Sequence, residues 1–184
     1  MNMTVILGIL LAGILSNNTA LLHFLGTGAV IENERNTKQS LLLGLGSTVV
    51  MLISTAITWP LNAYLLAKTP YLQTMVFVFV VLVVVEVIHI LAKKLLDNYC
   101  HSDFVKFAIN GAVLGLCIHN TELAFVEALV TAVAVGIGFT LSMTLFARLH
   151  RTVDEEAVPA SFRGLPIALL TAGMIALALL ALNF

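Results

Sequence analysis

Charged residues are scarce in this sequence. They make up 10% of its 184 residues, whereas 60% are hydrophobic. Soluble domains carry about 25% charged residues, so an ordinary water-soluble domain is excluded. Apolar runs near the ~20 residues needed to cross a bilayer recur along the chain. The sequence therefore predicts an all-α integral membrane protein in which residues 1–184 form a single transmembrane domain.

Cysteine and clustered basic residues are also scarce. Two cysteines, Cys100 and Cys117, are too few for a disulfide framework. The nine Lys and Arg residues are scattered and the net charge is −1, which argues against a nucleic-acid partner because phosphate binding needs a basic face. Without H-x-x-x-H or C-x-x-C spacing, His23, Cys117 and His119 are not expected to bind a metal. No soluble-enzyme motif is present.

Six apolar runs are candidate transmembrane helices. They cover residues 4–30, 41–59, 74–92, 104–118, 123–149 and 165–184. Pro60 is expected to end the second run, because proline lacks a backbone donor and clashes with the preceding turn. The first run contains Asn17 and Asn18 and the fourth contains Asn110. We expect both of these helices to be interrupted.

The two interruptions carry similar sequences. Asn18-Thr19-Ala20-Leu21-Leu22 in the first resembles Asn110-Gly111-Ala112-Val113-Leu114 in the fourth. Three helices separate one copy from the next, so the second copy is inverted in the membrane. The sequence therefore predicts a 3+3 inverted repeat, with repeat one at about residues 1–94 and repeat two at about 104–184.

The basic residues indicate an orientation. Eight of the nine fall in alternate loops, and Lys68 is the exception. Because cytoplasmic loops carry the excess of Lys and Arg, both termini are expected on the non-cytoplasmic side.

Polar side chains within the apolar runs are the candidates for function, since such residues are costly in a bilayer. Glu86 and His89 lie three residues apart, on one face of the third helix, where they could relay a proton or pair with each other. The alternative is that they only anchor the helix near the interface. Asn17, Asn18 and Asn110 could coordinate an ion together with unwound carbonyls, or merely cap the broken helices.

Two glycine pairs suggest close helix packing. Gly44 and Gly46 lie in the second run, and Gly136 and Gly138 in the fifth. Small residues let helices approach closely. We expect these glycines to line an interface with a sister subunit; the alternative is packing between the chain's own helices.

Three motifs together resemble a known family. They are Asn17-Asn18 with Phe24-Leu25-Gly26, then Asn110-Gly111-Ala112-Val113-Leu114-Gly115, then Val158-Pro159-Ala160-Ser161-Phe162-Arg163-Gly164 with Ile167-Ala168-Leu169-Leu170-Thr171-Ala172-Gly173. In order and spacing they are similar to the RnfA/NqrE-type membrane subunits of Rnf and sodium-pumping NADH:quinone oxidoreductase complexes. The last motif is the most specific.

The resemblance implies six helices in a bacterial or archaeal cell (inner) membrane, a homologous RnfE/NqrD-like partner of opposite topology, and further Rnf-like subunits. It also implies a [2Fe-2S] cluster between the two partners, held by cysteines. In this chain Gly28 and Gly111 stand at those cysteine positions. Glycine cannot hold iron, so we expect no cofactor to be bound by this chain alone.

Two functions follow from these expectations. In the first, the chain is a membrane subunit of an Rnf-like ion-translocating electron-transport complex, coupling redox-driven electron transfer to Na⁺ or H⁺ movement. It would then be a non-catalytic or cluster-less subunit of a translocase. In the alternative, it is a paralogue that lost the ligand cysteines and transports an ion or small solute without redox chemistry.

Overall fold

The computed structural model describes Gly8 and residues 37–66, 69–95, 111–152 and 158–181. Within these ranges every regular element is helical, which confirms the all-α prediction for this part of the chain. The α-helices are α4 (Thr37–Tyr64), α5 (Pro70–Leu95), α7 (Gly111–His119), α8 (Phe125–His150) and α9 (Leu165–Ala181), and the two 3₁₀ turns are η3 (Asn120–Glu122) and η4 (Ala160–Phe162).

Three of the helices are long and apolar enough to cross a membrane. The stretches are Ser40–Tyr64 in α4, Tyr71–Leu91 in α5 and Phe125–Leu149 in α8, and α9 adds a shorter apolar helix at Leu165–Ala178. The second, third and fifth predicted runs are therefore confirmed as candidate spans. Apart from Gly8, the first run lies outside the described residues, as does the fourth run before Gly111. The six-helix count and the two interruptions stay predictions.

The expectation that Pro60 ends the second helix is wrong. Helix α4 continues through Pro60 to Tyr64, and the amide of Leu65 donates to the carbonyl of Leu61 at 3.0 Å. Proline removes one backbone hydrogen bond, a loss that neighbouring helices can offset in a membrane protein. Here the indole of Trp59 packs against the ring of Phe125 on α8, with centroids 5.0 Å apart. This contact stabilises the last turns of α4.

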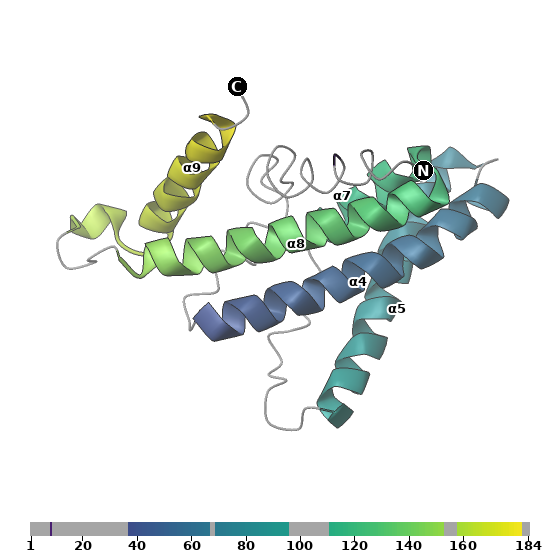
Figure 1. The fold of residues 1–184 in the computed structure, drawn as a ribbon, viewed down its shortest axis with the longest axis horizontal. Helices are drawn as coiled ribbons and strands as arrows, with labels where there is room; N and C mark the ends of the chain where they lie inside the picture. Colours follow the sequence, from purple (N-terminus) through teal and green to yellow (C-terminus); the bar gives the residue numbers. More distant parts are fainter. Residues whose placement is uncertain (1–7, 9–36, 67–68, 96–110, 153–157, 182–184) are drawn as a thin grey trace.

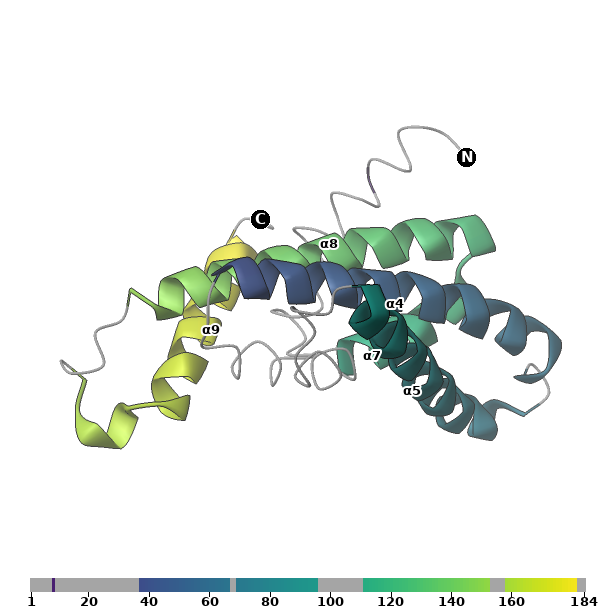
Figure 2. The ribbon, with the colours of Figure 1, turned by 90° about the horizontal axis from the view of Figure 1, so that it is seen from below.

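Helices α4 and α8 form the centre of the described structure. They lie side by side and antiparallel (Figures 1 and 2). A Cβ added to Gly44 would lie 2.8 Å from the Cα of Thr140, and one added to Gly136 would lie 2.5 Å from Cγ2 of Thr48. Both distances are shorter than real Cβ contacts, so these positions require glycine because the two helices approach so closely.

The same eight-residue pattern stands at this contact on both helices. It reads G-x-G-x-T-x-x-M, with Gly44, Gly46, Thr48 and Met51 on α4 and Gly136, Gly138, Thr140 and Met143 on α8. Each threonine hydroxyl donates to the carbonyl of its own glycine four residues earlier, at 2.9 Å. The two hydroxyl oxygens lie 3.2 Å apart, from residues 92 positions apart in the chain. The contact is therefore nearly symmetric.

This contact corrects one expectation from the sequence. Gly44 and Gly136 face the chain's own helices, so for these two residues the predicted role at an interface with a sister subunit is wrong. The alternative, packing within the chain, is the one observed. Small side chains let two antiparallel backbones approach closely over several turns, and here the two backbones are α4 and α8 of the same chain.

Helix α5 diverges from the central pair (Figure 2). A single stripe of α5 is buried, formed by Phe77, Val81, Val84 and Val85, at helical spacing. Side chains on the opposite face, such as those of Met75 and Phe79, are exposed. Within the described residues, α5 therefore joins the bundle along one narrow face.

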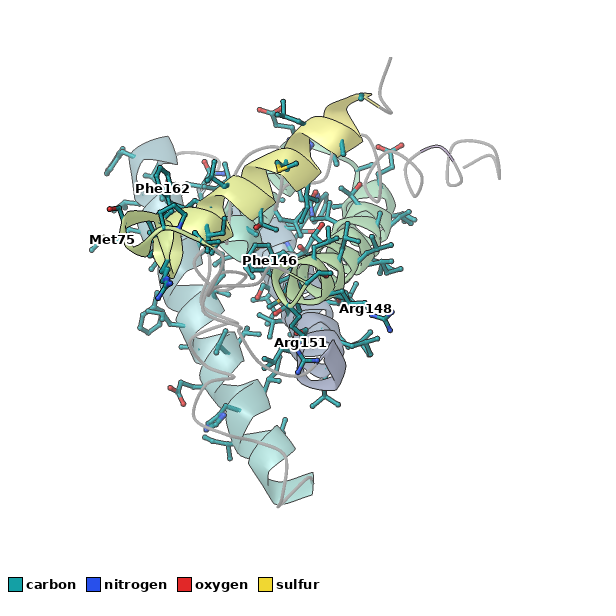
Figure 3. The ribbon with its side chains drawn as sticks, turned by 90° about the vertical axis from the view of Figure 1, so that its left-hand side faces the viewer. Met75, Phe146, Arg148, Arg151 and Phe162 are labelled. Atoms are coloured by element: carbon teal, nitrogen blue, oxygen red, sulfur yellow. The ribbon has the colours of Figure 1, made fainter. Side chains whose placement is uncertain are left out.

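Helix α9 packs on α8 and follows a tight turn. Gly164, just before α9, has φ = 75°, a left-handed conformation that side chains with a Cβ rarely adopt. The Nε of Arg163 donates to the carbonyl of Val158 at 3.0 Å and closes the turn. Figure 3 shows Arg148 and Arg151 at the end of α8, directed away from α9.

Candidate functional site

A buried polar cluster lies where the short helix α7 meets α4 and α8. Asn120, which directly follows α7, is 1% exposed. Its Nδ2 donates to the carbonyl oxygen of Ala128 on α8 at 3.2 Å and to Oγ1 of Thr55 on α4 at 3.4 Å. The buried thiol of Cys117 forms hydrogen bonds with Thr55 and Thr58. Three helices thus meet through polar side chains.

One atom of this cluster has no partner. The carbonyl oxygen of Ala128 only accepts hydrogen bonds, so the amide nitrogen of Asn120 must face it and Oδ1 must point elsewhere. Oδ1 of Asn120 is buried and accepts no hydrogen bond. The same is true of Oγ of Ser54, the residue before Thr55. A buried polar atom without a partner costs about 1–3 kcal/mol and is rare in folded proteins.

The backbone around the cluster is firmly held. The Nε1 of Trp59 donates to the carbonyl of Leu123 at 2.9 Å, and Oγ1 of Thr121 donates to the carbonyl of Ile118 at 2.7 Å. The described part of α7 has nine residues, Gly111–His119. Asn120, directly after the helix, is buried beside Thr55 of the span Ser40–Tyr64.

Glu86 and His89 lie on α5, away from this cluster. Gln73 of α5 reaches the start of the α7–α8 connection, since its Nε2 donates to Oγ1 of Thr121 at 3.4 Å. Glu86 is 13 positions further along α5, about 20 Å at ~1.5 Å per residue. Glu86 is exposed and His89 is half-buried. Their proposed role in proton relay stays a prediction.

The remaining sequence candidates divide into two groups. Asn17, Asn18, Asn110, His23 and Gly28 lie outside the described residues. Among the described ones, His119 is exposed whereas Cys117 is buried. No group of three or more His, Cys, Asp or Glu side chains that could hold a metal occurs in the part of the chain that the structure describes.

Sequence reasoning missed Asn120. It falls in the short connection between the fourth and fifth predicted runs, where an asparagine is an ordinary loop residue. Its partners Thr55 and Ala128 are 65 and 8 positions away. The hydrogen-bonding serines and threonines of α4 were a possible signal, but their spacing alone does not indicate which loop they contact.

The chain has relatives among known membrane proteins. Residues 6–184 match the family model described as Rnf-Nqr subunit, membrane protein. The chain belongs to the Rnf-Nqr subunit family. It is 36% identical to a protein of Syntrophotalea carbinolica that is named as a subunit of an ion-translocating oxidoreductase complex, over 92% of each chain. It is 32% identical to a protein of Acetobacterium woodii that is named as a subunit of the Na⁺-translocating ferredoxin:NAD⁺ oxidoreductase complex, over 95% of each chain.

The described residues of this Rnf-Nqr subunit do not fit the iron–sulfur cluster that the resemblance implies. Gly111, at one implied ligand position, is the exposed first residue of α7 and has no side chain. Cys117 lies six positions later, about 9 Å along a helix, and its thiol is buried against Thr55 and Thr58. Neither Gly111 nor Cys117 therefore supplies an iron ligand at the start of α7.

Proposed function

We propose that this chain is a membrane subunit of an Rnf-like ion-translocating electron-transport complex and couples redox-driven electron transfer to the movement of Na⁺ or H⁺. The observation that carries the proposal is similarity over more than nine-tenths of the chain to proteins named as subunits of such complexes. The three apolar spans and the buried polar cluster suit a protein that works inside the bilayer.

The paired α4 and α8 motifs support an inverted repeat in this subunit. Thr48 and Thr140 are 92 positions apart, the same separation as Asn18 and Asn110 at the proposed helix breaks. Equal spacing is expected if repeat one (about 1–94) and repeat two (about 104–184) share one fold. We infer that the partner is a homologous RnfE/NqrD-like subunit of opposite topology, which shields backbone groups that the breaks leave unpaired.

The orientation of the subunit is a further part of the proposal. Arg148, Arg151 and Arg163 all lie between α8 and α9 or at their ends, and all are exposed. The positive-inside rule assigns this side to the cytoplasm and both termini to the opposite side. A reporter that is active only outside the cytoplasm should therefore work when fused after Phe184. Activity of a cytoplasm-only reporter at that position would contradict the orientation.

One observation favours the alternative function. Gly28 and Gly111 replace the ligand cysteines, so a paralogue that moves an ion or small solute without redox chemistry is the second candidate. The two candidates differ in what drives transport. In the first, ion movement requires an electron donor and the other subunits, whereas in the second the chain alone moves its solute in proteoliposomes.

Affinity purification from the source cell in mild detergent tests the first candidate. We expect the tagged chain to bring down a homologous membrane protein together with subunits that carry flavin and iron. We expect no stoichiometric iron on the chain when it is expressed alone. Deleting its gene should abolish redox-driven ion uptake by inverted membrane vesicles, and a plasmid copy should restore it. A stable monomer without partners, together with unchanged uptake after deletion, would refute the proposal.

A further inference from the structure

We propose that the carbonyl oxygen of Asn120 is a ligand for a dehydrated monovalent metal cation such as Na⁺, held among α4, α7 and α8. The inference deepens the proposed function, because it names the ion and places its site. It starts from the unpartnered oxygen Oδ1 of Asn120. A second buried oxygen without a partner, Oγ of Ser54, lies on the helix that Asn120 contacts.

The orientation of the Asn120 amide is fixed by its neighbours. Its two amide hydrogens are directed to the carbonyl oxygen of Ala128 and to Oγ1 of Thr55. Reversing the amide would bring Oδ1 against the Ala128 carbonyl, which places two acceptors together. The unpartnered atom is therefore an acceptor, which suits a cation and not an anion.

The backbone adds negative potential at the same place. Asn120 follows the last residue of α7, a helix of nine residues whose C-terminal carbonyls carry a partial negative charge. The chain passes from α7 into the 3₁₀ turn η3, which places Asn120 beside Thr55 of α4.

The side chains of the cluster restrict the kind of cation. Asparagine, serine and threonine offer neutral oxygens that do not exchange a proton near neutral pH, and the remaining member, Cys117, is a buried thiol hydrogen-bonded to Thr55 and Thr58. The Asn120 amide donates to a carbonyl and a hydroxyl, and Glu122, the acidic residue of η3, is exposed. Ca²⁺ and Mg²⁺ depend largely on carboxylates. The cluster therefore favours Na⁺ over divalent cations, and metal-ion binding over protonation.

The test uses the full chain, alone and in the purified complex, in mild detergent. Its melting temperature is measured at increasing NaCl, with choline chloride added to keep the ionic strength constant. A ligand that binds only the folded state raises the melting temperature in a saturable way. We expect such a rise in the unmodified protein, and an apparent Na⁺ affinity about 10–100-fold weaker in Asn120→Ala, as for loss of a group that supports a metal site.

Two further variants keep the test decisive. Asn62→Ala removes an asparagine that is half-buried near the end of the same helix, α4, and should leave the Na⁺ response unchanged. Asn120→Asp preserves the size of the side chain but loses both donated hydrogen bonds and places a second carboxylate oxygen against the Ala128 carbonyl, so without Na⁺ it should be less stable than the unmodified protein. Its carboxylate should strengthen Na⁺ binding at neutral pH, and this gain should disappear as the pH falls through the carboxyl pKa because protons then compete.

The outcomes separate the inference from the proposed function. Saturable stabilisation by Na⁺ that is altered in both Asn120 variants and unchanged in Asn62→Ala supports the site. Equal stabilisation by choline, or a Na⁺ response that neither Asn120 variant changes, overturns it, because Oδ1 then binds at most a water molecule. A complex that assembles and couples electron transfer to proton movement without a Na⁺ response refutes the site alone. Na⁺ binding by a chain that joins no complex refutes the proposed function alone.

Discussion

Replacing Gly44 with leucine is expected to remove the folded chain from mild-detergent extracts. The added Cβ alone would lie 2.8 Å from the Cα of Thr140, and a backbone atom cannot turn aside as a side chain can. Helices α4 and α8 must then separate, and the central contact of the described structure is lost. Gly44→Ala should have a graded effect, with an overpacking cost of about 1–3 kcal/mol. Size-exclusion profiles and thermal unfolding measure both variants.

Gly173→Ala is the matched control for this prediction. Gly173 also lies in a helix, α9, but a Cβ there meets nothing within 4 Å. Because alanine favours helix over glycine by about 1 kcal/mol, this variant should be neutral or slightly more stable. Equal losses in Gly173→Ala and Gly44→Ala would show that the close contact with Thr140 is not the cause.

A pair of double variants separates the two halves of the contact. At Gly136 the nearest atom is Cγ2 of Thr48, at 2.5 Å, and Thr48→Ser removes that atom. Gly136→Ala should therefore recover part of its lost stability when combined with Thr48→Ser. Gly44→Ala should recover little with Thr140→Ser, because the backbone Cα of Thr140 remains in place.

The spans were predictable because they depend on a local property. Length and apolar content identify a membrane-spanning helix without reference to any other part of the chain. The predicted runs at 41–59, 74–92 and 123–149 therefore correspond to α4, α5 and α8. Pro60 was misjudged because the cost of proline in a helix is set by its surroundings. The contacts of Trp59 with Phe125 and the Leu123 carbonyl could not be read from the sequence.

The candidate site was less predictable because it is built from distant residues. Asn120 acquires its role from Thr55 on one helix and Ala128 on another. The glycines of α4 and α8 gave a correct signal of close packing but no indication of the partner surface. Packing between the chain's own helices and packing against a sister subunit produce the same pattern of small residues. Only the observed contact between Gly44 and Thr140 decides between them.

Two phenylalanines on α5 allow a sharp test of how this helix is attached. Phe77 is fully buried and Phe79 is 68% exposed, although they are two positions apart on the same helix. Phe77→Ala should lower the free energy of unfolding by about 3 kcal/mol, the low end for loss of a buried phenylalanine. The low end applies because an unfolded membrane chain keeps its side chains in lipid or detergent, so the loss comes from packing and the cavity.

Phe79→Ala provides the control on the same helix. Its side chain packs little within the described structure, so the isolated chain should unfold within about 0.5 kcal/mol of the unmodified protein. Both variants remove the same benzyl group from the same apolar segment, so any difference reports on packing and not on hydrophobicity. Reversible unfolding in mixed micelles, followed by the single tryptophan, Trp59, measures both. Similar losses in the two variants would mean that the outer face of α5 is packed against protein even in the isolated chain, contrary to the exposure of Phe79.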